Sequence, residues 1–206
     1  MKIITVSPRG FGANTYLITK DDKTAIVVDP AQPRVWEELQ KRGLIPVCVL
    51  LTHCHFDHVM GVDLLQGDGA RVYCSNEEKK LIGTDADLFS HFGAPRTQYT
   101  VDETFYDGEE KILNGISVKM LLTPGHTSGS CCYLVTDEQG ENYLFTGDTL
   151  FQGSIGRTDF PTGSIAQMRE SLKKLMTLDD MPVFAGHNDQ TTIEYERKTN
   201  PFIIDA

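Results

Sequence analysis

The sequence predicts an α/β protein in which two β-sheets pack face to face and helices cover both outer sides, giving four αββα layers. Short apolar or β-branched runs are followed by helical patterns twice along the chain. Neither a linker nor a low-complexity segment interrupts the 206 residues. That length suits one sizeable core. We therefore expect residues 1–206 to form a single domain.

The first half is expected to open as a meander of short strands and to continue with a helix and a central strand. Pro33 and Gly43 delimit the helix, because proline suits a first helical turn and glycine a helix end. The apolar run 47–51 is typical of a strand that is buried on both faces. The expected strands are residues 3–6, 15–19, 25–28, 47–51 and 71–74, and the expected helices are 34–42 and 76–82.

The second half repeats this order after a long irregular segment. Its clearest helix has an apolar stripe made by Ile165, Met168, Leu172 and Leu175. Residues 83–107 and 153–163 lack periodicity and are expected to be loops, the first with one helical turn. The expected strands are residues 111–113, 116–122, 131–136, 143–145 and 182–185, and the expected helices are 164–176 and 191–199.

Composition narrows the classes of partner and compartment. The net charge of -10 disfavours binding to nucleic acid, which requires surface cations. Five cysteines form no disulfide framework, and no run is apolar enough for a signal peptide or a membrane span. We expect a cytoplasmic monomer or small homo-oligomer that acts on a small molecule and contacts neither nucleic acid nor a membrane.

The densest chemical signal directly follows the central strand. Residues 53–58 read H-x-H-x-D-H and supply four candidate metal ligands, His53, His55, Asp57 and His58. The carboxyl end of a central strand is where open α/β sheets place their sites. The sequence therefore predicts a metal centre at this turn.

Three more candidate ligands follow other predicted strands. Each stands directly after a glycine, which allows a tight backbone close to a metal. They are His126 in Gly125-His126, Asp148 in Gly147-Asp148 and His187 in Gly186-His187. Five of the six histidines thus fall in these motifs, and His91 alone is left over.

The seven residues make a complete set of ligands for two adjacent divalent ions. Imidazoles and carboxylates suit zinc, and iron or manganese as well. Two ions that share a water lower its pKa and hold it as a bridging hydroxide against a polarised carbonyl, so hydrolysis is the predicted chemistry. We expect Asp57 and Asp148 to serve catalysis as well as metal binding. One ion would take His53, His55 and His126, the other Asp57, His58 and His187, and Asp148 would bridge them.

Three neighbouring residues have more than one interpretation. Asp29 ends a predicted strand, so it is either a turn former or a group that holds a ligand loop, or both. We expect Arg157 to form an ion pair with Asp159 in preference to a contact with substrate, and both roles remain open. Cys54 lies between two ligands, but alternation along an extended loop directs it away from them.

The chain resembles the metallo-β-lactamase fold superfamily through these seven residues, in order and over nearly its whole length. Within that superfamily it is similar to the short bacterial relatives of hydroxyacylglutathione hydrolase (glyoxalase II). The segments that carry this likeness are Asn14-Thr15-Tyr16-Leu17, residues 123–130, residues 145–161, Gly186-His187 and residues 196–202.

The resemblance implies the αββα sandwich and a binuclear hydrolase of thioesters such as S-lactoylglutathione. We expect the domain to be without the extra carboxyl-terminal helical region with which full-length glyoxalase II contacts glutathione. Arg157 is the nearest counterpart of the lysine that the family places near the thioester. Asp148 stands where the best-known zinc β-lactamases have cysteine, which argues against antibiotic hydrolysis.

Two other activities of this fold remain open. A persulfide (sulfur) dioxygenase would use one iron held by His53, His126 and Asp148. A lactonase or another ester hydrolase would use the same two ions as the thioester hydrolase.

Overall fold

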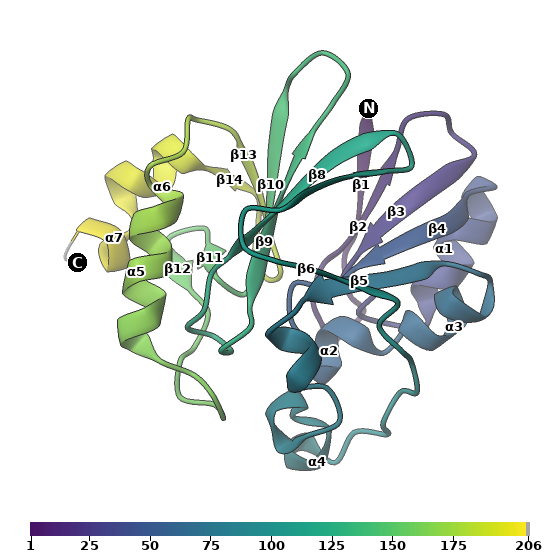
Figure 1. Ribbon diagram of the computed structural model, residues 1–206, viewed down its shortest axis with the longest axis horizontal. Coiled ribbons are helices and arrows are strands. Elements are labelled where there is room, and N and C mark those ends of the chain that lie inside the picture. Colours follow the sequence, from purple (N-terminus) through teal and green to yellow (C-terminus); the bar gives the residue numbers. More distant parts are fainter. Residues whose placement is uncertain (205–206) are drawn as a thin grey trace.

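The computed structural model describes residues 1–204 and places two six-stranded β-sheets between two groups of helices (Figure 1). Helices α1 and α3 cover the outer face of one sheet, and α5 and α6 lie on the far side of the other. The four-layered αββα architecture predicted from the sequence is confirmed.

The first sheet begins with an antiparallel meander and continues with parallel strands. Its β3, β4 and β5 run parallel, so their carboxyl ends share one edge of the sheet. In spatial order the strands are β1 (Lys2–Val6), β2 (Thr15–Thr19), β3 (Thr24–Val28), β4 (Ile45–Leu50), β5 (Arg71–Ser75) and β6 (Glu103–Phe105).

The second sheet is antiparallel apart from the parallel pair β10 and β13. A separate hairpin joins β11 (Leu150–Phe151) to β12 (Ser154–Ile155). In spatial order the strands of the sheet are β14 (Thr191–Thr192), β13 (Pro182–Ala185), β10 (Asn142–Gly147), β9 (Cys131–Thr136), β8 (Ile116–Leu122) and β7 (Glu110–Leu113).

The helices are short except for α1 and α5. Helix α1 covers the predicted residues, and Gly43 closes it in the left-handed conformation that glycine adopts without strain. The helices are α1 (Arg34–Arg42), α2 (Phe56–Val59), α3 (Val62–Gly67), α4 (Phe89–Phe92), α5 (Ile165–Leu175), α6 (Ile193–Thr199) and α7 (Pro201–Ile204), with 3-10 turns η1 (Glu78–Lys80) and η2 (Asp85–Asp87).

Three apolar clusters hold the layers together. The central cluster lies between the sheets and includes the fully buried Leu50, Phe105, Tyr133 and Phe145. A second cluster packs α1 and α3 on the first sheet, and a third packs α5 on the second sheet. Because burial of apolar surface is the main stabilising contribution, both sheets depend on the central cluster.

Some elements differ from those expected. The helix predicted at 76–82 is only the turn η1, and the loop 83–107 contains β6 as well as η2 and α4. Residues 191–192 form a strand before α6, and α7 was not predicted. Ile165, which belongs to the apolar stripe predicted for α5, is 45% exposed.

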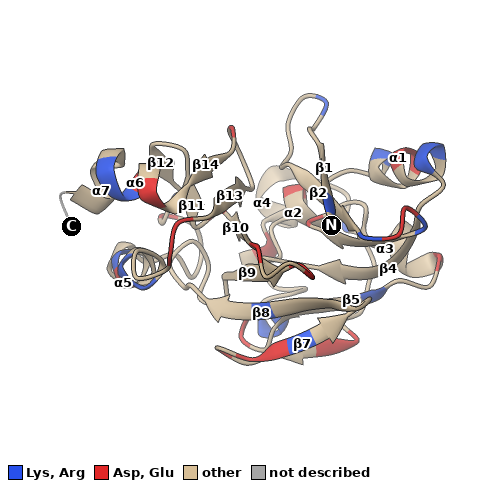
Figure 2. Cartoon of the chain, turned by 90° about the horizontal axis from the view of Figure 1, so that it is seen from above, with Lys and Arg blue, Asp and Glu red and all other residues tan. Residues whose placement is uncertain are grey.

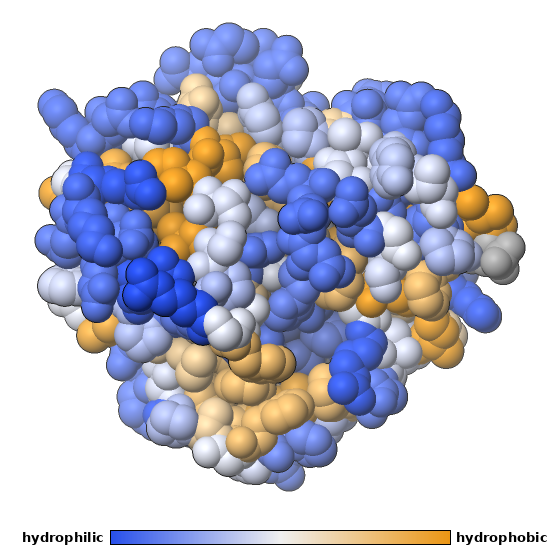
Figure 3. All heavy atoms as spheres, turned by 180° about the vertical axis from the view of Figure 1, so that it is seen from behind, coloured by the Kyte–Doolittle hydropathy of each residue, from blue (hydrophilic) through white to orange (hydrophobic). Residues whose placement is uncertain are grey.

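Charges of both signs are interspersed on the surface. Figure 2 shows Lys and Arg beside Asp and Glu on α1 and on α6, where Glu38 pairs with Lys41 and Glu194 with Lys198. Figure 3 shows an apolar patch next to the C-terminal end of the chain, where Phe202 and Ile204 of α7 are exposed. Within residues 1–204, no helix combines the length and the apolar character needed to cross a membrane.

Helix α5 allows a test of which apolar residues stabilise the second sheet. Leu172 is buried, so Leu172→Ala is expected to lower the free energy of unfolding by about 2–5 kcal/mol. The matched change Ile165→Ala removes an exposed side chain and is expected to change it by no more than about 0.5 kcal/mol. Urea unfolding would measure both, and equal losses would contradict this packing.

Candidate metal centre

Loops from both sheets meet at one edge of the sandwich. After β4, a loop carries His53 and His55, and helix α2 carries Asp57 and His58. The loops after β8, β10 and β13 carry one candidate ligand each. All seven side chains predicted as metal ligands lie together there, within two groups and a connecting carboxylate: His53, His55 and His126; Asp57, His58 and His187; and Asp148.

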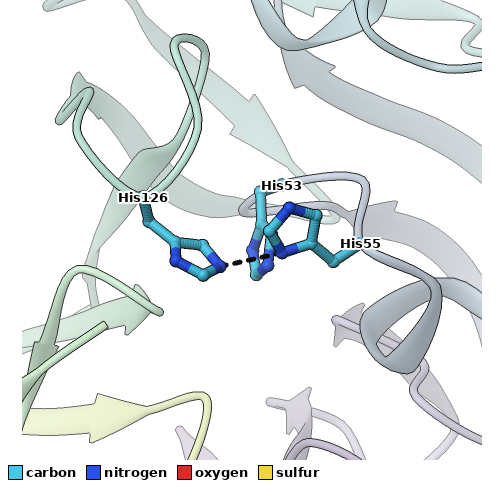
Figure 4. A group of neighbouring side chains, drawn as sticks. All are labelled: His53, His55 and His126. Carbon is cyan, nitrogen blue, oxygen red and sulfur yellow. Dashed lines mark hydrogen bonds between the residues drawn. The ribbon is translucent and has the colours of Figure 1, made fainter. Parts of the chain in front are cut away.

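The first group consists of three buried imidazoles. The rings of His53, His55 and His126 converge from two loops, with ring centres 4.5–4.7 Å apart (Figure 4). His126 Nε2 lies 2.8 Å from His55 Nδ1. Three imidazole nitrogens directed at one point are typical of a transition-metal site.

The second group lies beside the first, and Asp148 contacts both. His187 Nε2 is 3.4 Å from Asp57 Oδ2. Asp148 Oδ1 is 3.2 Å from His58 Nε2, and its Oδ2 is 3.5 Å from both His126 Nε2 and His187 Nε2. One carboxylate thus lies within 3.5 Å of both groups, with Oδ2 between His126 and His187, as expected for a bridging ligand.

Asp29 orients two of the ligands. Its Oδ2 accepts hydrogen bonds from His58 Nδ1 at 2.9 Å and from the Thr52 hydroxyl at 2.6 Å. Since that hydroxyl donates to Asp29, it is free to accept from His53 Nδ1, which lies 3.1 Å away. Both imidazoles therefore carry their proton on Nδ1 and present Nε2 to the centre. Asp29 has a φ of 47° at the end of β3, so both interpretations of this residue are confirmed.

His126 is oriented in the same way by a backbone group. Its Nδ1 lies 2.7 Å from the carbonyl oxygen of Arg157, which can only accept a hydrogen bond. Nδ1 therefore carries the proton, and Nε2 faces His55 and Asp148. The loop that carries Arg157 thus positions a candidate ligand irrespective of what its side chain does.

Glu78 joins two ligand loops and was missed as a functional residue by the sequence reasoning. Its buried carboxylate accepts from the backbone nitrogen of Cys54 at 2.7 Å and from the hydroxyl of Thr127 at 2.6 Å. These residues adjoin His55 and His126. The sequence Ser75-x-x-Glu78 has the pattern of a helix capping box, and the Ser75 hydroxyl accepts from the Glu78 backbone nitrogen at 2.9 Å. The Glu78 side chain, however, turns to the ligand loops.

The β13 loop is attached to the first sheet. Tyr16 on β2 donates its hydroxyl proton to the carbonyl of Ala185 at 2.6 Å, and the backbone nitrogen of Asn14 donates to Gly186 at 2.7 Å. Gly186 leaves no room for a side chain, because a Cβ there would lie 2.3 Å from Asp148 Oδ1 and 2.7 Å from His58 Cε1. The backbone thus comes close to two candidate ligands at this glycine, while its predicted approach to a metal stays a prediction.

Burial sets the protonation of the imidazoles. It lowers the pKa of His53 and His126 and lowers that of His55 to about 3, so these three are neutral near pH 7. Burial also disfavours charged His58, but Asp148 and Asp29 outweigh it and raise the pKa of that ring. Neutral imidazoles have the lone pair that metal binding requires, so His53, His55 and His126 are ready to bind an ion, whereas His58 would lose a proton on binding one.

The donor set fits a metal better than it fits a metal-free core. Within the described part of the chain, four buried side-chain atoms have no hydrogen-bond partner, and each belongs to a predicted ligand: His53 Nε2, His55 Nε2, His58 Nε2 and Asp148 Oδ1. Buried polar atoms without partners are costly. Coordination of a metal would satisfy His53 Nε2, His58 Nε2 and Asp148 Oδ1, whereas His55 faces His126 with its Nδ1.

A pocket of about 400 Å³ opens over this centre. Arg157 lies at its edge, where the guanidinium makes two hydrogen bonds of 2.7 Å to Asp159. The predicted ion pair is thus present, while a substrate role for Arg157 remains a prediction. Cys54 is buried beside the pocket, and His91 is exposed on α4.

We expect Asp29→Asn to weaken zinc binding by about 10- to 100-fold. Both carboxylate oxygens of Asp29 accept hydrogen bonds, one from the Thr52 backbone nitrogen and the other from the Thr52 hydroxyl and His58, and an amide has a single oxygen with which to accept them. Competition with a chromophoric chelator would measure the affinity. Asp179→Asn, a change at an exposed position, is the matched control. Unchanged affinity in Asp29→Asn would contradict the orienting role of this carboxylate.

We also expect Glu78→Gln to weaken metal binding about tenfold, because a glutamine offers one acceptor where Cys54 and Thr127 both donate. The neighbouring change Glu77→Gln removes a charge that pairs with Lys80 on the surface and serves as the control. If both variants bound zinc like the wild type, Glu78 would only stabilise the fold.

The chain has relatives of known description. The sequence profile of the Metallo-beta-lactamase superfamily matches residues 8–187. The hydroxyacylglutathione hydrolase GloC of Haemophilus influenzae is 36% identical over 98% of this chain and 98% of its own length.

Solved structures of differently described proteins share the fold of this chain. BLEG-1, a B3 metallo-beta-lactamase, has a TM-score of 0.89 at 30% identity and covers 98% of this chain and 99% of its own. TTHA1623 in a di-iron-bound form has a TM-score of 0.82 at 31% identity, with coverage of 98% and 100%. ETHE1 from Myxococcus xanthus has a TM-score of 0.78 at 28% identity, with coverage of 98% and 84%. Together with the fold and the ligand set, these matches establish that the chain belongs to the metallo-beta-lactamase superfamily.

Proposed function

We propose that this protein is a binuclear metal-dependent hydrolase of thioesters such as S-lactoylglutathione. The observation that carries the proposal is the carboxylate of Asp148, whose Oδ2 lies 3.5 Å from one histidine of each ligand group, beneath an open pocket. The 36% identity to the GloC hydrolase supports the thioester class.

The positions of the candidate ligands suggest which residues would hold each of the two ions. His53, His55 and His126 would hold one ion, Asp57, His58 and His187 the other, and Asp148 both. Two such ions supply a water of lowered pKa and polarise the carbonyl. Asp57 and His187 line the pocket directly, so they lie where a substrate enters. A thiolate leaves readily because its thiol has a pKa of about 8.5.

Zinc is the metal we propose, because imidazole and carboxylate ligands suit it well. Iron and manganese accept the same ligands, and TTHA1623 was solved in a di-iron-bound form. Which metal this chain takes is therefore a matter for metal analysis of the purified protein.

A persulfide dioxygenase is the second candidate, and the likeness to ETHE1 favours it. It would use one iron on His53, His126 and Asp148, of which the last two lie 3.5 Å apart. A lactonase or other ester hydrolase would use the same two ions as the thioester hydrolase. The likeness to BLEG-1 adds β-lactams to the substrates that have to be tested.

The expectations about partners, compartment and oligomeric state remain predictions. A small-molecule substrate is consistent with a pocket of about 400 Å³. That the protein contacts no nucleic acid or membrane, works in the cytoplasm, and is a monomer or small homo-oligomer is inferred from the sequence alone.

The test is the initial rate of S-lactoylglutathione hydrolysis by protein of determined metal content. Asp148→Ala and removal of metal by a chelator are each expected to lower the rate by about 10³-fold or more, because both remove the centre that activates water. Re-addition of zinc should restore the chelated sample only, and Asp179→Ala should keep the wild-type rate.

A protein loaded with two metals that hydrolyses no thioester would reject the proposal. Lactones and a chromogenic β-lactam would then be the next substrates. One iron per chain, with oxygen uptake on glutathione persulfide, would establish the dioxygenase instead.

A further inference from the structure

One wall of the pocket above the metal centre is built from aromatic side chains of four separate segments. Phe56 stacks on Phe11 with ring centres 5.8 Å apart and contacts Phe92 at 5.0 Å. Phe92 in turn meets Phe160 at 6.0 Å. We call Phe11, Phe56, Phe92 and Phe160 the aromatic wall. All four line the pocket.

The two outer residues of the aromatic wall are exposed. Phe11 is 66% and Phe92 is 48% accessible to solvent, so neither side chain belongs to the buried core. Phe160 also makes an edge contact of 5.8 Å with His55, so the wall extends from the pocket mouth to a metal-ligand candidate. Adjacent exposed aromatics in a concave site are typical of a surface that binds apolar groups.

Apart from the proposed metal ions, the pocket offers little positive charge to an anionic ligand. Among the described residues that line it, Arg157 is the one Lys or Arg. Its guanidinium is bound by Asp159 through two hydrogen bonds and lies 3.9 Å from the ring centre of Phe160. A thiol carrier with two carboxylates, such as glutathione, would find its matching cation already paired.

We propose that the thioesters hydrolysed at this site carry a neutral apolar group of about phenyl size, which packs on the aromatic wall, and that the glutathione peptide contributes little to recognition. This inference rests on the proposed thioester hydrolase. The oxygen of water bonds to the acyl carbon while the carbon–sulfur bond breaks, and the electron pair leaves with sulfur as thiolate. The apolar group takes no part in that step and acts through binding alone.

The test compares thioesters that differ at one position. For metal-loaded protein, kcat/KM would be measured with the phenylacetyl and lactoyl thioesters of N-acetylcysteamine, with S-lactoylglutathione, and with the acetyl thioester of benzyl mercaptan. We expect a gain of about 10- to 100-fold for the phenylacetyl over the lactoyl thioester, as burial of a ring on an apolar wall provides. The benzyl thioester shows whether the thiol side can supply the same group.

Two exposed variants test the wall itself. Phe92→Ala and Phe11→Ala lie on different segments, and each is expected to reduce the phenylacetyl preference by about 3- to 10-fold. Tyr106→Ala removes an aromatic side chain of similar exposure that does not line the pocket, and it should leave the preference unchanged.

The outcomes separate this inference from the function on which it rests. Hydrolysis of all thioesters with equal kcat/KM, or a preference of tenfold or more for S-lactoylglutathione over its N-acetylcysteamine counterpart, would overturn the aromatic-wall proposal and leave the thioester hydrolase standing. Failure to hydrolyse any of them would overturn both.

Discussion

The buried carboxylate of Asp29 is the interaction on which the candidate site depends. A charge removed from water is costly unless donors surround it, and here the backbone and hydroxyl of Thr52 and the ring of His58 supply three hydrogen bonds. The backbone of Asp29 is fixed as well, because Thr15 donates its hydroxyl proton to the Asp29 carbonyl at 2.6 Å. Strands β2, β3 and β4 therefore end in one network, and that network sets the tautomers of His53 and His58.

The site forms only when both sheets are assembled. The backbone nitrogen of Cys131 on β9 donates to the Thr52 carbonyl at 3.0 Å, and Tyr133 donates its hydroxyl proton to Leu51 at 2.9 Å. In the other direction Tyr16 reaches Ala185 on β13. These bonds cross the interface between the sheets directly behind the ligands. The packing of the two sheets, and not the conformation of single loops, therefore sets the distance between the ligand groups.

The sequence indicated which residues would lie together in the candidate site because each follows the end of a strand, where the chain must turn and where a polar residue is not explained by packing in a core. Helix α1 was predicted to the residue because Pro33 and Gly43 mark its limits. The three-residue strand β6 was missed because so short a segment has no readable alternation, and its pairing with β5 is a tertiary contact. The role of Glu78 could not be predicted either, since the sequence shows its local capping pattern but not that Thr127 lies next to it.

The metal centre relates to the type of reaction, and the pocket wall relates to the choice of substrate. Proteins described as a hydroxyacylglutathione hydrolase, a B3 metallo-beta-lactamase and ETHE1 all match nearly the whole of this chain, so the fold does not select the substrate. The converging imidazoles and carboxylates determine the class of chemistry. In the proposal made above, the residues around them, here Phe11, Phe92 and the paired Arg157, select which molecule binds. These side chains are exposed and lie outside the hydrogen bonds around Asp29, so substituting them would change the pocket without disturbing that network.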